Sequence, residues 1–354
     1  MKKITFAFLL CFCIVIAGYA GSEAVEAPAA PPPAAQGNDE TEDVPVEPVN
    51  FQFVPGLGTA GVNHKATNYV LFGMLSAIGH NLRGFGLSGI SLINTGYVAG
   101  FQSSGLFNIV SRDMTGLQMA GLFNRVREDM RGVQASGIFN IIEGSGTGLQ
   151  TSGVFNWTGE SFRGLQMGLV NYDGGDDGLG MRIGLVNVSK SENVIPIGLV
   201  NIVKNGIMHP AVWYDDLGFV NLSLKSGSRY FYSILGLGVH NSLFFDDDPM
   251  FVTRTGIGAE LPLDRFFLDF DLTAGHIFSN FSWTENNAFI AQARLSAGYK
   301  IFKHLGIFVG VSYDYIISPR NGSLKPGKDF GFSALAWSSG RNTHKIGFFG
   351  GVQF

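Results

Sequence analysis

Between residues 100 and 156 one nine-residue motif occurs four times: Gly100-Phe-Gln-Ser-Ser-Gly-Leu-Phe-Asn108, Gly116-Leu-Gln-Met-Ala-Gly-Leu-Phe-Asn124, Gly132-Val-Gln-Ala-Ser-Gly-Ile-Phe-Asn140 and Gly148-Leu-Gln-Thr-Ser-Gly-Val-Phe-Asn156. The leading glycines are sixteen residues apart. Shorter copies ending in Asn171, Asn187 and Asn201 follow, and a degenerate copy ending in Asn94 precedes the array. A fixed spacing of this kind indicates a repeat architecture.

Each copy has the pattern of a β-strand followed by a polar turn. In the shorter form, Leu165, Met167 and Leu169 alternate with Gln166 and Gly168, which is the period of two typical of a strand. The longer form carries one extra small residue, which we expect to be absorbed as a β-bulge. The segments between the copies are rich in turn-forming residues.

Two all-β architectures can use this unit. In an antiparallel transmembrane β-barrel each copy is one strand, because about ten residues cross the membrane and the rest form turns. In a parallel β-solenoid each copy is one rung and asparagine stacks on asparagine. The turns do not alternate in length, which favours a solenoid, but Gly218-Phe-Val-Asn221 repeats the motif within the barrel-like region that follows. We therefore predict that the repeats are additional barrel strands, with a β-solenoid plus an eight-stranded C-terminal barrel as the alternative.

We divide the chain into four regions. A positive start, an apolar run from Ile4 to Ala17 and small residues up to Ala20 predict a signal peptide over residues 1–20. Residues 21–50 contain seven acidic residues and six prolines without Lys or Arg, which predicts a disordered linker. Residues 51–205 are the β-repeat region, and residues 206–354 are the C-terminal barrel strands, ending in Phe354. Both cysteines, Cys11 and Cys13, lie in the expected signal peptide, so the expected mature chain has no thiol.

The C-terminal region alternates charged and apolar residues. Leu268, Phe270 and Leu272 alternate with Asp269 and Asp271, for example. With a signal peptide and no cysteine in the mature chain, we take the charged face to be the lumen of a membrane barrel. The predicted lumen-facing residues are Arg254, Glu260, Asp269, Asp271, Arg294, Lys300 and Asp314. Six aromatic residues near strand ends suit a girdle at the membrane interfaces: Tyr230, Tyr232, Trp283, Tyr313, Tyr315 and Trp337.

The last strand and the repeat array carry two resemblances. Ile346, Phe348 and Val352 alternate up to Phe354, which resembles the terminal strand of bacterial outer-membrane proteins, where a final aromatic residue is the assembly signal. The Gly-x-Gln-x-(Ala/Ser)-Gly-x-Phe-Asn array with the barrel-like strands resembles surface repeat-containing outer-membrane proteins of spirochaetes and Bacteroidetes. This similarity covers most of the chain after Phe51, and it implies an outer-membrane or cell-surface location without an activity.

Several kinds of chemistry are not expected. No run of eighteen apolar residues follows the signal peptide, which argues against helical membrane spans, and a net charge of −4 gives no case for nucleic-acid binding. Two GxGxxG matches do not open a helix in a βαβ unit, and the dispersed histidines and the aspartates at 173–177 and 246–248 lack metal-ligand spacing. We predict no catalytic residue, cofactor or metal site, although His240 near Asp246 imitates the rim of outer-membrane hydrolases.

The expected function is that of an outer-membrane β-barrel protein, structural or channel-like, with an unknown ligand. Its expected partners are outer-membrane lipid and the outer-membrane assembly machinery. The alternative is a surface-displayed β-repeat protein that binds an extracellular or cell-wall partner and is held by a small C-terminal barrel.

Overall fold

The computed structural model describes residues 45–59, 65–241, 249–279, 287–302, 305–318 and 335–354. The expected signal peptide and the predicted linker up to residue 44 lie outside these residues. Strand β1 begins at Val46, within the stretch for which we expected a linker. Among the described residues we find no helix with the length and apolarity of a membrane span. They form a β-solenoid and a β-barrel within one compact unit.

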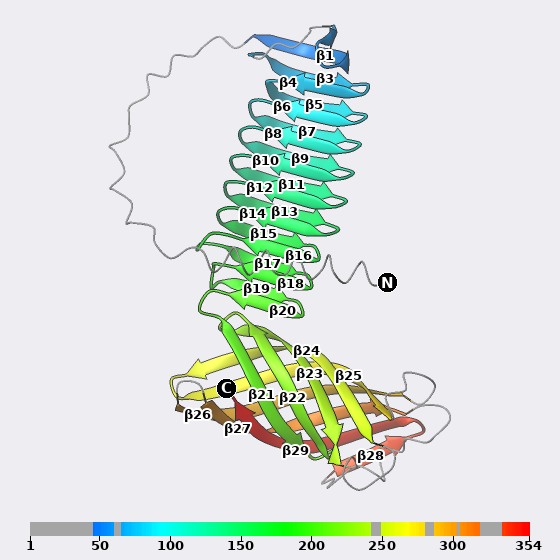
Figure 1. The fold of residues 1–354 in the computed structure, drawn as a ribbon, viewed down its shortest axis with the longest axis vertical. Coiled ribbons are helices and arrows are strands. Elements are labelled where there is room, and N and C mark those ends of the chain that lie inside the picture. The colour runs from blue at the N-terminus through cyan, green and yellow to red at the C-terminus, as the bar shows by residue number, and fades with distance from the viewer. Residues whose placement is uncertain (1–44, 60–64, 242–248, 280–286, 303–304, 319–334) are drawn as a thin grey trace. The chain divides into compact units, whose positions relative to one another are not determined.

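The repeats form the solenoid, in which each rung gives one strand to each of two sheets (Figure 1). The first sheet contains β1 Val46–Val54, β2 Leu57–Gly58, β3 Thr67–Gly73, β5 Asn81–Ser88, β7 Val98–Ser104, β9 Met114–Ala120, β11 Met130–Ser136, β13 Gly146–Ser152, β15 Phe162–Met167, β17 Leu179–Ile183 and β19 Val194–Ile197. The second contains β4 Ser76–Gly79, β6 Ser91–Asn94, β8 Phe107–Val110, β10 Phe123–Val126, β12 Phe139–Ile142, β14 Phe155–Thr158, β16 Val170–Asp173, β18 Val186–Ser189 and β20 Val200–Val203.

Equivalent residues of successive rungs pair in parallel, so that Gln118 lies beside Gln134 and Asn124 beside Asn140. These amides are fully buried between the two sheets. Gln134 Nε2 donates to Gln118 Oε1 at 2.9 Å, and Asn124 Nδ2 donates to Asn140 Oδ1 at 3.0 Å. An unpaired buried amide costs about 1–3 kcal/mol, so the amide columns favour the register in which identical residues stack.

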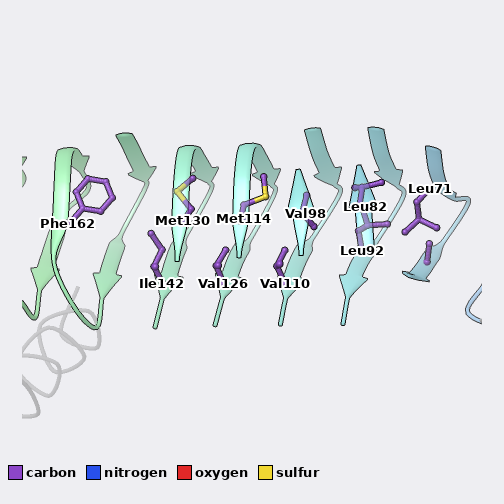
Figure 2. Close-up of a cluster of buried hydrophobic side chains, with 11 residues drawn as sticks. Leu71, Leu82, Leu92, Val98, Val110, Met114, Val126, Met130, Ile142 and Phe162 are labelled. Atoms are coloured by element: carbon purple, nitrogen blue, oxygen red, sulfur yellow. The ribbon is translucent and has the colours of Figure 1, made fainter. Parts of the chain in front are cut away.

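An apolar column completes the solenoid core. Met114 and Met130 from the first sheet lie beside Val126 and Ile142 from the second, and all four are inaccessible to solvent (Figure 2). The column continues through successive rungs from Leu71 to Phe162. Burying apolar surface stabilises the folded state by about 25 cal/mol per Å². A rung buries its apolar side chains only when the neighbouring rungs are stacked on it.

The repeats are therefore not additional barrel strands, and the alternative architecture is the observed one. Each repeat contains two short strands, such as β9 and β10, which fall below the roughly nine to eleven residues that a transmembrane strand needs. The extra small residue, Ala120, ends β9, and Gly121 and Leu122 form a corner between two sheets, so there is no bulge within one strand. Parallel stacking also places each buried amide beside the equivalent residue of the next rung, as Gln118 beside Gln134.

The glycine that opens each motif is required by the close approach of neighbouring rungs. Gly132 has a φ of 130°, in a region that side chains rarely adopt. A Cβ atom on it would lie 2.0 Å from the carbonyl oxygen of Gly116, one rung earlier. The periodic glycine therefore marks a close backbone contact that is repeated between neighbouring rungs of the solenoid.

The C-terminal strands form an antiparallel barrel that closes through β21 and β29. This confirms the predicted all-β class and the antiparallel barrel. The strands are β21 Ile207–Asp215, β22 Phe219–Gly227, β23 Phe231–His240, β24 Met250–Leu263, β25 Phe266–Ser279, β26 Ala288–Phe302, β27 Leu305–Ile317 and β29 Asn342–Gln353, with β28 Leu335–Ser339 paired to β29 outside the closed ring.

The two ends of the barrel have connections of different length. At the end where β21 follows the solenoid, the connections are residues 228–230, 264–265 and 303–304, and the chain also ends there. At the other end they are residues 216–218, 241–249, 280–287 and 318–341. The solenoid and the C-terminus therefore share the end with short connections.

Candidate functional site: the charged interior of the barrel

The barrel strands alternate between a charged interior and an apolar outer wall. On β25, Asp269 and Asp271 are 1% and 2% exposed, whereas Leu268 and Phe270 are 40% and 49% exposed. Val309 on β27 is 69% exposed. A water-soluble β-sheet protein has the opposite polarity, with apolar residues inside and charges outside.

Six of the seven residues for which we predicted lumen-facing side chains are buried in the barrel: Arg254, Glu260, Asp269, Asp271, Arg294 and Asp314. Lys300 lies near the end of β26, and its side chain is 30% exposed. Lys300 Nζ lies 3.5 Å from Glu260 Oε1, so this pair sits toward the end with short connections. The structure thus brings all seven residues into one set of neighbouring strands, β24 to β27.

Arg254 connects three strands. Its Nη2 donates to Asp215 Oδ2 at 2.7 Å, and its Nε donates to Asn221 Oδ1 at 2.9 Å. Asn221 Nδ2 in turn donates to Asp215 Oδ2 at 3.0 Å. Both charged groups of the Arg254–Asp215 pair therefore have an opposite charge beside them and further hydrogen bonds. A buried ion pair needs both, because a buried charge without them is strongly destabilising.

A second network crosses the barrel from β22 to β26. Arg294 Nη2 donates to Asp271 Oδ2 at 2.7 Å, and the Tyr232 hydroxyl donates to Asp271 Oδ1 at 2.6 Å. Lys225 Nζ donates to Asp269 Oδ2 at 2.6 Å. Tyr232 is 1% exposed and points into the barrel, so its predicted place in an aromatic girdle is wrong.

Apolar rings fill the space between these charges. Arg294 lies over the rings of Trp213 and Phe349, at 4.7 and 5.2 Å from their centroids. Phe267 packs so closely that a Cβ atom on Gly298 would lie 2.0 Å from its ring. An eight-stranded barrel has an interior just wide enough for side chains to fill, and this barrel has that packing.

Sequence reasoning missed several members of these networks, notably Asp215, Lys225 and Lys345. Lys345 Nζ lies 3.0 Å from Asp216 Oδ2 near the end with long connections. The alternation that identified Asp269 also applies to β22, where Ser223 and Lys225 alternate with Leu222 and Leu224. The alternation in the sequence of β22 therefore also identifies Lys225 as an interior residue.

Among the described residues, the other candidate groups pack against or pair with neighbouring side chains. His240 packs edge-on against the Phe219 ring at 5.1 Å, and Asp246 lies outside the described residues. Asp173, in the aspartate-rich stretch at 173–177, is buried and paired with Arg182. Within the described ranges no three His, Cys, Asp or Glu side chains gather as a metal site would need.

Aromatic side chains lie near both ends of the barrel. At the end with long connections, the Trp337 ring stacks on His344 at 5.4 Å and lies 6.5 Å from Tyr313. At the other end, Phe266 packs against Tyr299 at 5.1 Å. Trp283, which we also expected in a girdle, lies outside the described residues.

Comparison of the chain with protein-family models, with curated proteins and with solved structures finds no match.

Proposed function

We propose that this protein is an outer-membrane β-barrel protein whose small, filled barrel anchors a β-solenoid to the membrane. The observation that supports this most is the polarity of the barrel, with ion pairs inside and aliphatic and aromatic side chains on the wall. In lipid, strands are viable only in a closed barrel, because every backbone group must be bonded. The closure through β21 and β29 meets that requirement.

The proposal includes membership of the surface repeat-containing proteins that the array resembles. It also includes outer-membrane lipid as the partner of the barrel wall and the assembly machinery as the partner of β29. A structural role is favoured over a channel, because paired charges and the rings of Trp213, Phe267 and Phe349 occupy the interior. No enzymatic activity is assigned.

The unequal connections favour one orientation. Outer-membrane barrels have short turns on the periplasmic side and longer loops outside the cell. The solenoid leaves the barrel at the end with short connections, with residues 204–206 between β20 and β21. We therefore propose that the solenoid lies in the periplasm rather than on the cell surface. Display on the cell surface would require the reverse loop pattern.

Cysteine labelling of intact cells tests this orientation. Glu128→Cys places a thiol in an exposed connection of the solenoid, and Ser339→Cys places one on β28 near the long connections. A membrane-impermeant maleimide should label position 339 in intact cells and position 128 after the outer membrane is permeabilised. Labelling of position 128 in intact cells would show that the solenoid is displayed outside, and labelling of neither variant after permeabilisation would contradict an outer-membrane location.

A further inference from the structure

One corner of the solenoid carries an exposed aliphatic residue in nine successive rungs. These residues, called the aliphatic column below, are Leu75, Ile90, Leu106, Leu122, Ile138, Val154, Leu169, Leu185 and Leu199, and they are 38–44% exposed. Backbone bonds join neighbours, for example Leu122 N to Leu106 O at 2.8 Å and Leu199 N to Leu185 O at 3.0 Å. With strands about 4.8 Å apart, the column is about 38 Å long.

Apolar residues flank this column on both sheets. On the second sheet the rings of Phe107, Phe123 and Phe139 stack at 5.1 and 5.2 Å. On the first sheet Met119 and Met167 are 42% and 40% exposed. A soluble monomer rarely exposes a continuous apolar patch of this extent, so such a patch marks a binding surface.

The opposite corner of the rungs is charged from residue 111 onward. The connections that return from the second sheet to the first carry Arg112, Glu128 and Asp129, with Arg112 Nε 4.0 Å from Glu128 Oε1. From residue 111 onward each rung therefore has one charged corner and one apolar corner. The exposed aliphatic residue occupies the equivalent position in all nine rungs, which aligns the apolar corners into one continuous surface.

The aliphatic column leads onto the outer wall of the barrel. Leu169, Leu185 and Leu199 line a groove of about 660 Å³ together with Thr255 and Ile257 of β24. Ile257 is 47% exposed and belongs to the apolar wall. Hydrogen bonds hold this junction, since Gly198 N donates to Ser233 Oγ at 3.2 Å and Asn201 Nδ2 donates to Ser226 O at 3.1 Å.

We propose that the aliphatic column binds the acyl chains of phospholipids from the bilayer that holds the barrel. This inference rests on the proposed function, because the barrel wall must face lipid for the groove to open onto acyl chains. Lipid is favoured over a second copy of the chain because the column is continuous with that wall. The column is also longer than the hydrocarbon core of a bilayer, about 30 Å thick, so it can accept a chain along its length.

Photocrosslinking tests the proposal on the full chain. The protein is reconstituted into vesicles of phosphatidylethanolamine and phosphatidylglycerol that contain a phospholipid with a diazirine at the end of one acyl chain. After irradiation, adducts are mapped by mass spectrometry. We expect adducts on wall residues such as Phe270 and Val309 and on column residues such as Leu185 and Leu199. The triple variant Leu169→Ser, Leu185→Ser, Leu199→Ser should reduce column adducts about tenfold, which corresponds to about 1.4 kcal/mol of lost contact.

Leu179→Ser is the matched control. Leu179 is 57% exposed on β17, but it pairs with Arg163 at the charged side of the rung, so its replacement should leave the column adducts unchanged. Adducts on the wall without adducts on the column would overturn this inference and leave the proposed function standing. No adducts on either would overturn the proposed function as well. Disulfide-linked dimers of a Leu185→Cys variant would overturn the inference that lipid binds the column, because they would show that a second copy of the chain covers it.

Discussion

At the scale of single residues, an ion pair replaces an amide near the C-terminal end of the solenoid. Arg182 pairs in register with Gln166, and Asp173 pairs with Thr158. Arg182 Nη2 lies 2.8 Å from Asp173 Oδ2, and both side chains are buried. Burial lowers the pKa of Arg182 while Asp173 opposes that shift, so the guanidinium stays charged. Burial of this ion pair removes two charged groups from water, which costs free energy that the neutral amide columns do not lose.

A double-mutant comparison tests this reading. Asp173→Thr alone leaves Arg182 buried without its counter-charge, and we expect it to lower the free energy of unfolding by about 3–5 kcal/mol. Adding Arg182→Gln restores the residue types of the preceding rung. An amide at position 182 can donate to Gln166 Oε1, which accepts no hydrogen bond from the described residues.

We therefore expect the double variant to be as stable as the original protein, or more stable, in urea unfolding followed by circular dichroism in detergent micelles. A double variant as unstable as Asp173→Thr alone would show that the ion pair, not the interrupted amide column, stabilises these rungs.

Single residues also show which side-chain positions could be predicted from the sequence. Alternation alone separated Asp269 and Asp271 from Leu268 and Phe270, because a strand points successive side chains to opposite faces. It could not show that Tyr232 lies inside, since a tyrosine near a strand end suits an aromatic girdle as well as a buried hydrogen bond to Asp271. That choice depends on which strands meet across the barrel.

At the scale of elements, the repeat was visible in the sequence, but the division of each copy into two strands in different sheets was not. A run such as 114–126 can be read as one long strand, and the Gly121-Leu122 step between β9 and β10 can then be a bulge or a corner. The corner is selected by contacts sixteen residues away, where Asn124 bonds to Asn140. The regular turn lengths favoured this solution, whereas the motif Gly218–Asn221 favoured barrel strands. In the structure Gly218 lies in the turn before β22, and the other three residues of this motif begin that strand.

The last strand is the element whose removal should be most damaging to assembly. Phe354 N donates to Pro210 O at 2.8 Å, beside the β21–β29 seam that closes the barrel. We expect Phe354→Ala to reduce the amount of folded protein in the outer membrane several-fold, because we propose that the assembly machinery recognises the final aromatic residue. The amount is measured by heat-modifiable migration of outer-membrane fractions in detergent gels.

Phe348→Ala provides the control on β29, the strand that Phe354 directly follows. Phe348 is 59% exposed on the outer wall, similar to Phe354 at 50%, so both changes remove an exposed ring of the same size. Equal loss from the two variants would mean that the last residue has no special role in assembly.

At the scale of the whole molecule, the filled barrel predicts a protein that does not conduct. Ion pairs such as Arg254 with Asp215 and Arg294 with Asp271 occupy the interior together with Trp213 and Phe267. Barrels of sixteen or more strands leave an aqueous channel, whereas eight strands leave none wider than their side chains. In planar bilayers we expect no stable conductance steps from the purified protein. Regular steps that persist after removal of contaminating porins would contradict this prediction.

Quenching by brominated phospholipids measures the contact between the outer wall of the barrel and lipid. A fluorophore attached through Leu295→Cys would lie on the wall, where Leu295 is 54% exposed, and one attached through Ser339→Cys would lie on β28 near the long connections. In vesicles whose acyl chains carry bromine near the bilayer centre, we predict strong quenching at position 295 and little at position 339. Equal, weak quenching at both positions would show that the wall faces water and would contradict the account.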